Sequence, residues 1–249
     1  MAHPDPGGSS DASPIALAAG LTRNYGPLRA LDAVDLTLRK GEFLTIFGPN
    51  GAGKTTLLKI LATIMRPSSG TLSLFGLDPA REPEAVKRRI GMIGHAGYLY
   101  GGLGARDNLI FFARLQDLPD AALRADAALE RAGLADRAGD AVRTYSRGMQ
   151  QRLAIARALI HDPALLLLDE PFTGLDQHAS VSLRKMLHGL HQAGRTLVMV
   201  THHLDEGLDV STRVAIMSWG RIAHEEAAAG LTRESLERLY LGVAAGAPA

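Results

Sequence analysis

The residues between positions 48 and 56 have the types and spacing needed to hold a polyphosphate. They fit the pattern G-x-x-x-x-G-K-[ST] and read Gly48, Pro49, Asn50, Gly51, Ala52, Gly53, Lys54, Thr55 and Thr56. Gly51 and Gly53 have no Cβ, so backbone N–H groups can curl around phosphates, and a following helix turns its positive N-terminus to the anion. We expect Lys54 to reach the β- and γ-phosphates and Thr55 to offer its hydroxyl to Mg²⁺, with Thr56 on another phosphate oxygen. A glycine-rich turn that merely contains a lysine is the alternative.

An acidic pair follows a run of four leucines. Asp169 and Glu170 come directly after Leu165 to Leu168, and the carboxyl ends of strands are where open α/β sheets bind ligands. We expect Asp169 to hold the Mg²⁺ shell and Glu170 to orient and polarise the attacking water, because phosphoryl transfer needs mainly positioning and charge stabilisation. A solvated acidic pair at a strand end is the alternative. Kinases, GTPases, helicases and transport ATPases share the phosphate loop, so these residues leave the reaction open.

Hydrophobic periodicity places these motifs on an α/β framework. Strand patterns occur between positions 15 and 47, and helical spacing follows from 55 to 65. Further strands are expected at 71–75, 90–93, 165–168, 196–200 and 214–217, and helices at 107–115, 120–132 and 147–160, with Asp120 as an N-cap. The unbroken apolar strands suit a parallel sheet covered on both faces.

Composition narrows the function classes. With 27 basic and 26 acidic residues among 249, the chain has no polycationic field, and we expect no nucleic-acid partner. It has no cysteine, which excludes disulfides and thiolate chemistry. Residues 1–14 have the composition of a disordered tail without signal-peptide character. No apolar run reaches the eighteen residues of a membrane-spanning helix, so a membrane role would need another chain to cross the bilayer.

Residues 145–152 carry a resemblance to a known family. Tyr145-Ser146-Arg147-Gly148-Met149-Gln150-Gln151-Arg152 resembles the signature segment of ABC ATPases, usually close to Leu-Ser-Gly-Gly-Gln, although Arg147 and Met149 depart from that form. The resemblance extends from about position 15 to 226. It implies a P-loop NTPase (RecA-like) fold, with a mainly parallel sheet, an antiparallel β subdomain and a helical subdomain at about 95–147. Residues 227–249 are then a C-terminal helix and tail.

The same resemblance assigns further roles. It places a D-loop at Thr173 to Asp176, a γ-phosphate-sensing histidine at His202, and an adenine-stacking aromatic at Tyr25. Asp176 is either a dimer contact or a helix N-cap, or both. For the adjacent histidines 202 and 203, a polar strand end and a metal site are the alternatives, and His203 receives no role.

The resemblance also implies partners. Two such domains pair head to tail, as a homodimer or heterodimer, so that Ser146 and Gly148 of one subunit complete the ATP site of the other, with Arg147, Met149 and Gln150 beside them. Integral membrane subunits are the other partners, which puts the chain in the cytoplasm on the inner face of the cell membrane. The expected ligands are ATP and Mg²⁺.

His95 stands where ABC ATPases carry the Q-loop glutamine. A ring nitrogen there is a further candidate for the Mg²⁺ shell, and a half-buried histidine without nucleotide contact is the alternative. Together with Tyr98 and Asp107-Asn108, this region looks like the ATP-binding subunit of the haem exporter of cytochrome c maturation.

The haem exporter is therefore the first functional interpretation, with no direct haem binding by this chain. An ABC-2 exporter of drugs, polysaccharides or lipids is the alternative. A soluble ABC protein acting on nucleic acid or ribosomes usually has two cassettes or long coiled-coil insertions, which this sequence lacks. A purely structural protein is the weakest alternative.

Overall fold

The computed structural model describes residues 14–94 and 97–245. The strands are β1 (Pro14–Tyr25), β2 (Leu28–Arg39), β3 (Phe43–Phe47), β4 (Ser69–Leu74), β5 (Ile90–Ile93), β6 (Leu165–Asp169), β7 (Thr196–Thr201), β8 (Arg213–Ser218) and β9 (Arg221–Ala227). The helices are α1 (Lys54–Leu61), α2 (Pro83–Lys87), α3 (Ala105–Leu115), α4 (Ala121–Ala132), α5 (Arg147–Ala158), α6 (Gln177–Gln192), α7 (Leu204–Val210) and α8 (Arg233–Ala245), with short 3₁₀ turns at Ala135–Arg137 and Val142–Thr144.

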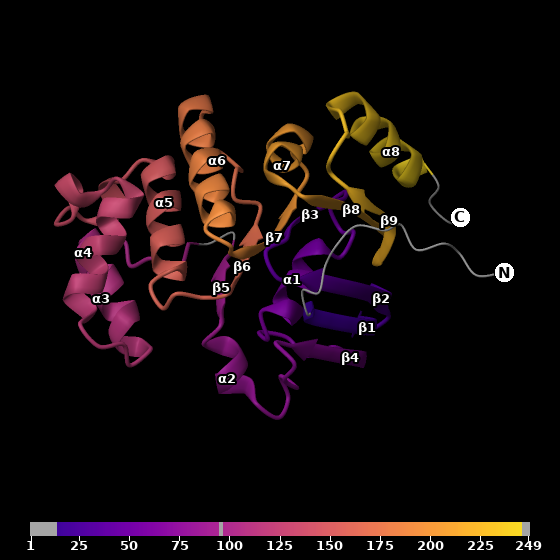
Figure 1. Cartoon of the computed structure of the whole chain (residues 1–249), viewed down its shortest axis with the longest axis horizontal. Helices are drawn as coiled ribbons and strands as arrows, with labels where there is room; N and C mark the ends of the chain where they lie inside the picture. Colours follow the sequence, from indigo (N-terminus) through magenta and orange to yellow (C-terminus); the bar gives the residue numbers. More distant parts are fainter. Residues whose placement is uncertain (1–13, 95–96, 246–249) are drawn as a thin grey trace.

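A six-stranded sheet forms the centre of the molecule (Figure 1). Its order is β5-β6-β7-β3-β8-β9, and only β9 runs antiparallel to its neighbour. Every residue of β3, β6 and β7 is buried, as expected for parallel strands covered by helices on both faces. Because all five parallel strands point the same way, their carboxyl ends meet at one edge, and the motifs gather there.

A second, antiparallel sheet packs beside it. Its order is β2-β1-β4, and Val34, Leu36 and Leu38 of β2 are buried while the residues between them are exposed. This is the predicted antiparallel subdomain, and with the parallel sheet it confirms the predicted fold class. Pro14, predicted to lie in a disordered tail, is instead the first residue of β1 and pairs with Arg39; residues 1–13 lie outside the described part.

A helical lobe lies at the end of the molecule farthest from the antiparallel sheet (Figure 1). Helices α3, α4 and α5 share a core that includes Leu109, Leu129 and Leu153. This core continues beyond position 147 because α5 packs on both sides. Its Leu153 lies in the core of the lobe, whereas Ala154 and Ile155 pack on the central sheet. Asp120 precedes α4 as predicted, but it has a left-handed backbone and its side chain caps nothing.

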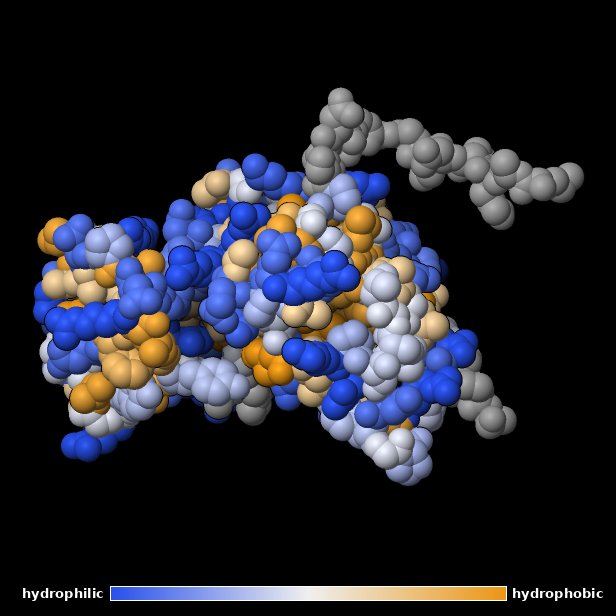
Figure 2. All heavy atoms as spheres, turned by 90° about the horizontal axis from the view of Figure 1, so that it is seen from below, coloured by the Kyte–Doolittle hydropathy of each residue, from blue (hydrophilic) through white to orange (hydrophobic). Residues whose placement is uncertain are grey.

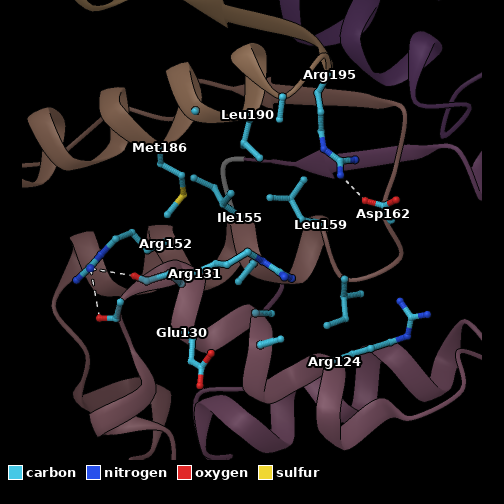
Figure 3. A pocket seen from close by; sticks show the side chains of 18 of the residues that line it. Arg124, Glu130, Arg131, Arg152, Ile155, Leu159, Asp162, Met186, Leu190 and Arg195 are labelled. Carbon is cyan, nitrogen blue, oxygen red and sulfur yellow. Dashed lines mark hydrogen bonds and ion pairs between the residues drawn. The ribbon is translucent and has the colours of Figure 1, made fainter.

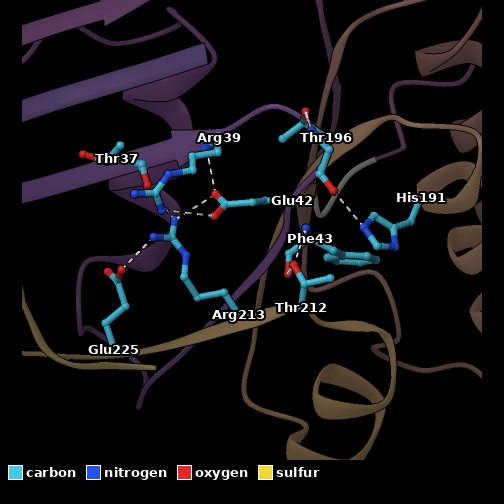
Figure 4. A network of polar contacts seen from close by, with 10 residues as sticks. Thr37, Arg39, Glu42, Phe43, His191, Thr196, Thr212, Arg213 and Glu225 are labelled. Atoms are coloured by element: carbon cyan, nitrogen blue, oxygen red, sulfur yellow. Dashed lines mark hydrogen bonds and ion pairs between the residues drawn. The ribbon is translucent and has the colours of Figure 1, made fainter. Parts of the chain in front are cut away.

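A network of polar contacts joins the sheets at the edge opposite the motifs (Figure 4). Arg213 of β8 forms ion pairs with Glu42 at 3.2 Å and with Glu225 at 2.8 Å. Glu42 also accepts the backbone N–H of Arg39 at 2.7 Å, and His191 at the end of α6 bonds the carbonyl of Gly41 at 2.8 Å. These contacts fix the entry to β3, the strand that leads into the phosphate loop. Among residues 14–94 and 97–245, no helix is both long enough and apolar enough to span a bilayer.

Candidate active site at the carboxyl edge of the sheet

The phosphate loop joins β3 to α1, and its glycines are required by close packing. A Cβ on Gly48 would overlap the backbone oxygen of Met217. Gly53 has a φ of 99°, and a Cβ there would overlap the backbone oxygen of Ala30. Gly53 is also the N-cap of α1 and provides no side-chain cap. The first turn of α1 therefore presents N–H groups that no side chain caps, which suits phosphate oxygens.

Lys54 is buried within this loop. Its Nζ donates to the carbonyl of Gly48 at 2.5 Å and to that of Pro49 at 3.1 Å. Burial lowers the pKa of Lys54 below its ordinary value, and the nearby carboxylates of Glu170 and Asp169 act in the opposite direction. An anion in the loop would favour the charged ammonium, so the residue suits a polyphosphate.

Thr55 and Asp169 meet across the edge of the sheet. The Thr55 hydroxyl donates to Asp169 Oδ1 at 3.0 Å, although 114 positions separate the two residues in sequence. A hydroxyl and a carboxylate beside a phosphate loop form the all-oxygen set that Mg²⁺ prefers. The chain's own atoms therefore fit a Mg–nucleotide at this point.

Glu170 is held by residues that follow the neighbouring strand. β6 and β7 are parallel with Asp169 opposite Val200, and the backbone N–H of Glu170 donates to the Val200 carbonyl at 2.9 Å. The Thr201 hydroxyl donates to Glu170 Oε2 at 3.1 Å, and His202 Nδ1 lies 2.9 Å from Glu170 Oε1. Glu170 has a φ of 51°, an uncommon backbone conformation for a non-glycine residue. The carboxylate is thus fixed next to Thr55 and Asp169, where a water could be oriented.

Thr201 is the member of this group to which the sequence assigned no role. It is the last residue of β7 and bonds both Glu170 and the backbone N–H of His203, the latter at 3.1 Å. The sequence does offer one signal for this role: a threonine that ends a buried, mostly apolar strand directly before a histidine.

The signature segment forms the start of α5. Ser146 is the N-cap, and its hydroxyl accepts the N–H of Met149 at 3.3 Å. A Cβ on Gly148 would come within 2.7 Å of the Ala179 side chain, and one on Gly174 within 2.7 Å of the Arg147 guanidinium. Arg147 and Gly148 therefore pack against residues 174–179 of the same chain, and Gln150 bonds the carbonyls of Val142 and Tyr145 at 3.2 Å. 

Asp176 caps the helix that follows the D-loop. Its Oδ1 accepts the N–H of Ala179 at 2.7 Å, at the first turn of α6. The helix-cap alternative is therefore present in the structure, and a dimer contact by Asp176 remains a proposal.

Tyr25 ends β1 and is 41% exposed. Its hydroxyl bonds Met65 Sδ at 3.0 Å, and the Arg23 guanidinium lies 5.0 Å from the ring centroid. His95 lies outside the described residues.

Two hollows differ in their relation to these motifs. One, of about 660 Å³, belongs to the site and is lined by Asp169, Glu170, Arg147 and Gln151 together with Gly97, Tyr98, Leu99 and Gly101. A larger groove of about 1060 Å³ lies between α4, α5 and α6 (Figure 3). Its arginines include Arg195, paired with Asp162, and Arg152, bonded to backbone carbonyls. Of the predicted site residues that the structure describes, none lines this groove.

Comparison with known proteins agrees with this geometry. The family model described as ABC transporter matches residues 31–173. The chain is similar to the daunorubicin resistance ATP-binding protein DrrA3 of Streptomyces coeruleorubidus, at 40% identity over 218 residues, which cover 87% of this chain and 69% of that protein. It is also similar to the ABC transporter ATP-binding protein NatA of Bacillus subtilis (strain 168), at 37% identity over 217 residues, which cover 86% of this chain and 85% of that protein.

One similar solved structure shows an ATP-binding cassette after ATP hydrolysis. A dimeric ATP-binding cassette in a post-hydrolysis state, bound to ADP and Pi, matches with a TM-score of 0.76 and 28% identity, over 87% of this chain and 100% of that one. With the matched family model and the relatives, this establishes that the chain belongs to the ABC transporter family, as an ATP-binding subunit that hydrolyses ATP.

Proposed function

We propose that the chain powers an exporter of the ABC-2 kind, with drug-like or other amphipathic molecules as cargo. The similarity to DrrA3, a protein named for daunorubicin resistance, carries this proposal. Neither relative described above is named for haem, and His95, the residue on which the haem-exporter resemblance depended most, lies outside the described residues. The drug-exporter alternative therefore has more support than haem export.

In the proposed reaction the chain's residues bind and orient rather than form covalent bonds. Lys54 would exchange its bonds to the Gly48 and Pro49 carbonyls for phosphate oxygens, while Thr55 and Asp169 would hold Mg²⁺. Glu170 would take the proton of the attacking water, and His202 would hold the γ-phosphate. We assign the adenine to the exposed ring of Tyr25.

The proposed site is completed by a second subunit. Ser146 is the N-cap at the positive end of α5, a position that suits a γ-phosphate from a partner chain, and the related cassette with ADP and Pi is a dimer. A shared site makes a clear prediction about mixtures. Ser146→Asp keeps a helix-capping oxygen but sets a negative charge against the phosphate, so this variant should fold and lose ATPase activity.

Mixing Ser146→Asp with Lys54→Ala should restore activity that neither variant has alone. In the mixed dimer, one site combines an intact loop with an intact signature. With random pairing, half of the dimers are mixed and each has one good site, so we expect about a quarter of wild-type phosphate release. Each variant incubated alone is the control. No recovery in the mixture, with mixed dimers demonstrated by differential tagging, would contradict a site shared between subunits.

The surface that we propose for the membrane subunits lies on the helical lobe. Tyr100, Phe111 and Phe112 form a cluster with ring centroids 5.1–6.1 Å apart. Phe111 is 40% exposed, and Leu115, one turn further along α3, is 66% exposed. Apolar side chains also gather over this lobe in the space-filling view (Figure 2). An exposed apolar face of this kind on a folded domain suits a protein partner.

Leu115→Glu should therefore release the chain from its membrane partner while leaving its own ATPase activity in place. We would purify the complex from native membranes, identify the spanning subunits, and compare their recovery with wild type. Leu123→Glu, at an equally exposed leucine on α4 (70%), is the matched control and should bind normally. Full recovery of the spanning subunits with Leu115→Glu would contradict the proposed surface, and recovery of haem-handling subunits would contradict drug export.

A further inference from the structure

Three potential metal ligands converge at the carboxyl ends of β6 and β7. They are Glu170, His202 and His203, and one ligand atom from each lies within 4.8 Å of the other two. The two imidazole rings are 4.1 Å apart between centroids, tilted by 36°. Because β6 and β7 are neighbouring parallel strands in register, a residue after one strand must lie close to residues after the other.

His203 has no other function among the contacts of the described residues. It occupies the N-cap position of α7, yet its side chain makes no capping hydrogen bond, and its imidazole contacts the ring of His202. Its backbone N–H instead bonds Thr201, which also holds Glu170. The same threonine thus fixes the backbone of one potential ligand and the carboxylate of another, as outer residues do in metal sites.

From these observations we propose that Glu170, His202 and His203 bind a divalent transition-metal ion such as Zn²⁺. Two imidazoles and one carboxylate form a known catalytic-type zinc donor set, with water as the fourth ligand. Ligand atoms about 2.1 Å from a tetrahedral ion are about 3.4 Å apart. The ligand atoms that now lie up to 4.8 Å apart must therefore approach one another by about 1.4 Å at most. Rotation of the half-exposed His202 side chain can supply this movement. The carboxylates of Asp169 and Glu170 lie near the ammonium of Lys54, and Arg147 lines the same hollow as both carboxylates.

This site differs in chemistry from the magnesium pair beside it. Thr55 and Asp169 provide only oxygen atoms, which suit Mg²⁺, whereas imidazole nitrogen selects zinc, copper or nickel. An ion on Glu170 and His202 would occupy the residues proposed to activate water and hold the γ-phosphate. Zn²⁺ should therefore inhibit ATP hydrolysis without displacing nucleotide. The inhibition rests on the proposed roles of these residues; metal binding does not.

Metal binding is tested first, on the nucleotide-free protein without a histidine tag. Isothermal titration with Zn²⁺ and visible absorption with Co²⁺ should show one tetrahedral site per chain. His203→Asn should weaken this site by at least about tenfold, the usual effect of disturbing a metal site. His178→Asn, at an exposed histidine of α6, is the matched control and should bind like wild type. No stoichiometric binding by the wild type, or unchanged binding by His203→Asn, overturns the proposal.

Inhibition is tested separately. His203→Asn should hydrolyse MgATP at the wild-type rate but resist Zn²⁺ concentrations that inhibit the wild type, and a zinc-selective chelator should restore the wild-type rate. If His203-dependent binding occurs without inhibition, the metal site stands and the roles proposed for Glu170 and His202 are overturned.

Discussion

Glu170→Gln should bind ATP with wild-type affinity and lose about 10²- to 10⁴-fold in turnover, the range for removing a general base. The substitution keeps the size of the side chain, and its amide oxygen can still accept the Thr201 hydroxyl that now bonds Glu170 at 3.1 Å. The substitution removes the basicity and the negative charge of the side chain. If ATP joins the two subunits of the proposed dimer and its hydrolysis releases them, the variant should accumulate as a dimer in MgATP.

Three measurements check this expectation: equilibrium ATP binding, phosphate release, and size-exclusion chromatography with and without MgATP. Glu130→Gln, at an exposed glutamate of α4, is the control and should behave like wild type. Hydrolysis at the wild-type rate by Glu170→Gln would show that another group activates the water.

Lys54→Ala should abolish measurable ATP binding under conditions that saturate the wild type. Losing a buried charge that pairs with phosphate costs about 2–5 kcal/mol, which corresponds to about 30- to 4,000-fold in Kd. The folded structure should tolerate the change, because burial already disfavours the charged form of Lys54, as its lowered pKa shows. Thermal unfolding of the nucleotide-free variant should therefore remain close to that of the wild type.

Lys59→Ala is the matched control, since it removes the same side chain from the same helix, α1, five positions further along. It should bind ATP normally. A Lys54→Ala protein that folds and binds ATP with wild-type Kd would refute the proposed role of the loop lysine. A variant that fails to fold would instead show that the bonds from Lys54 to the Gly48 and Pro49 carbonyls hold the loop together.

The sequence by itself determined the features that depend on local spacing. The loop from Gly48 to Thr56 is recognisable because each glycine and the lysine have fixed positions along a continuous chain. The all-apolar run Leu165–Leu168 indicates a parallel strand because no face of it can contact water. Periodicity also located the helical lobe, but it extended α1 to Met65, whereas the helix ends at Leu61 and leaves Ile64 exposed.

The tertiary structure decided which of these residues meet. Thr55 reaches Asp169 across 114 positions, and Glu170 reaches Thr201 and His202 across more than thirty. No local pattern sets these distances, because they follow from the order of strands and from the register of β6 on β7. That register brings His203, which had no role in the sequence, beside Glu170. Pairing between parallel strands is non-local, so this convergence became visible only in the folded chain.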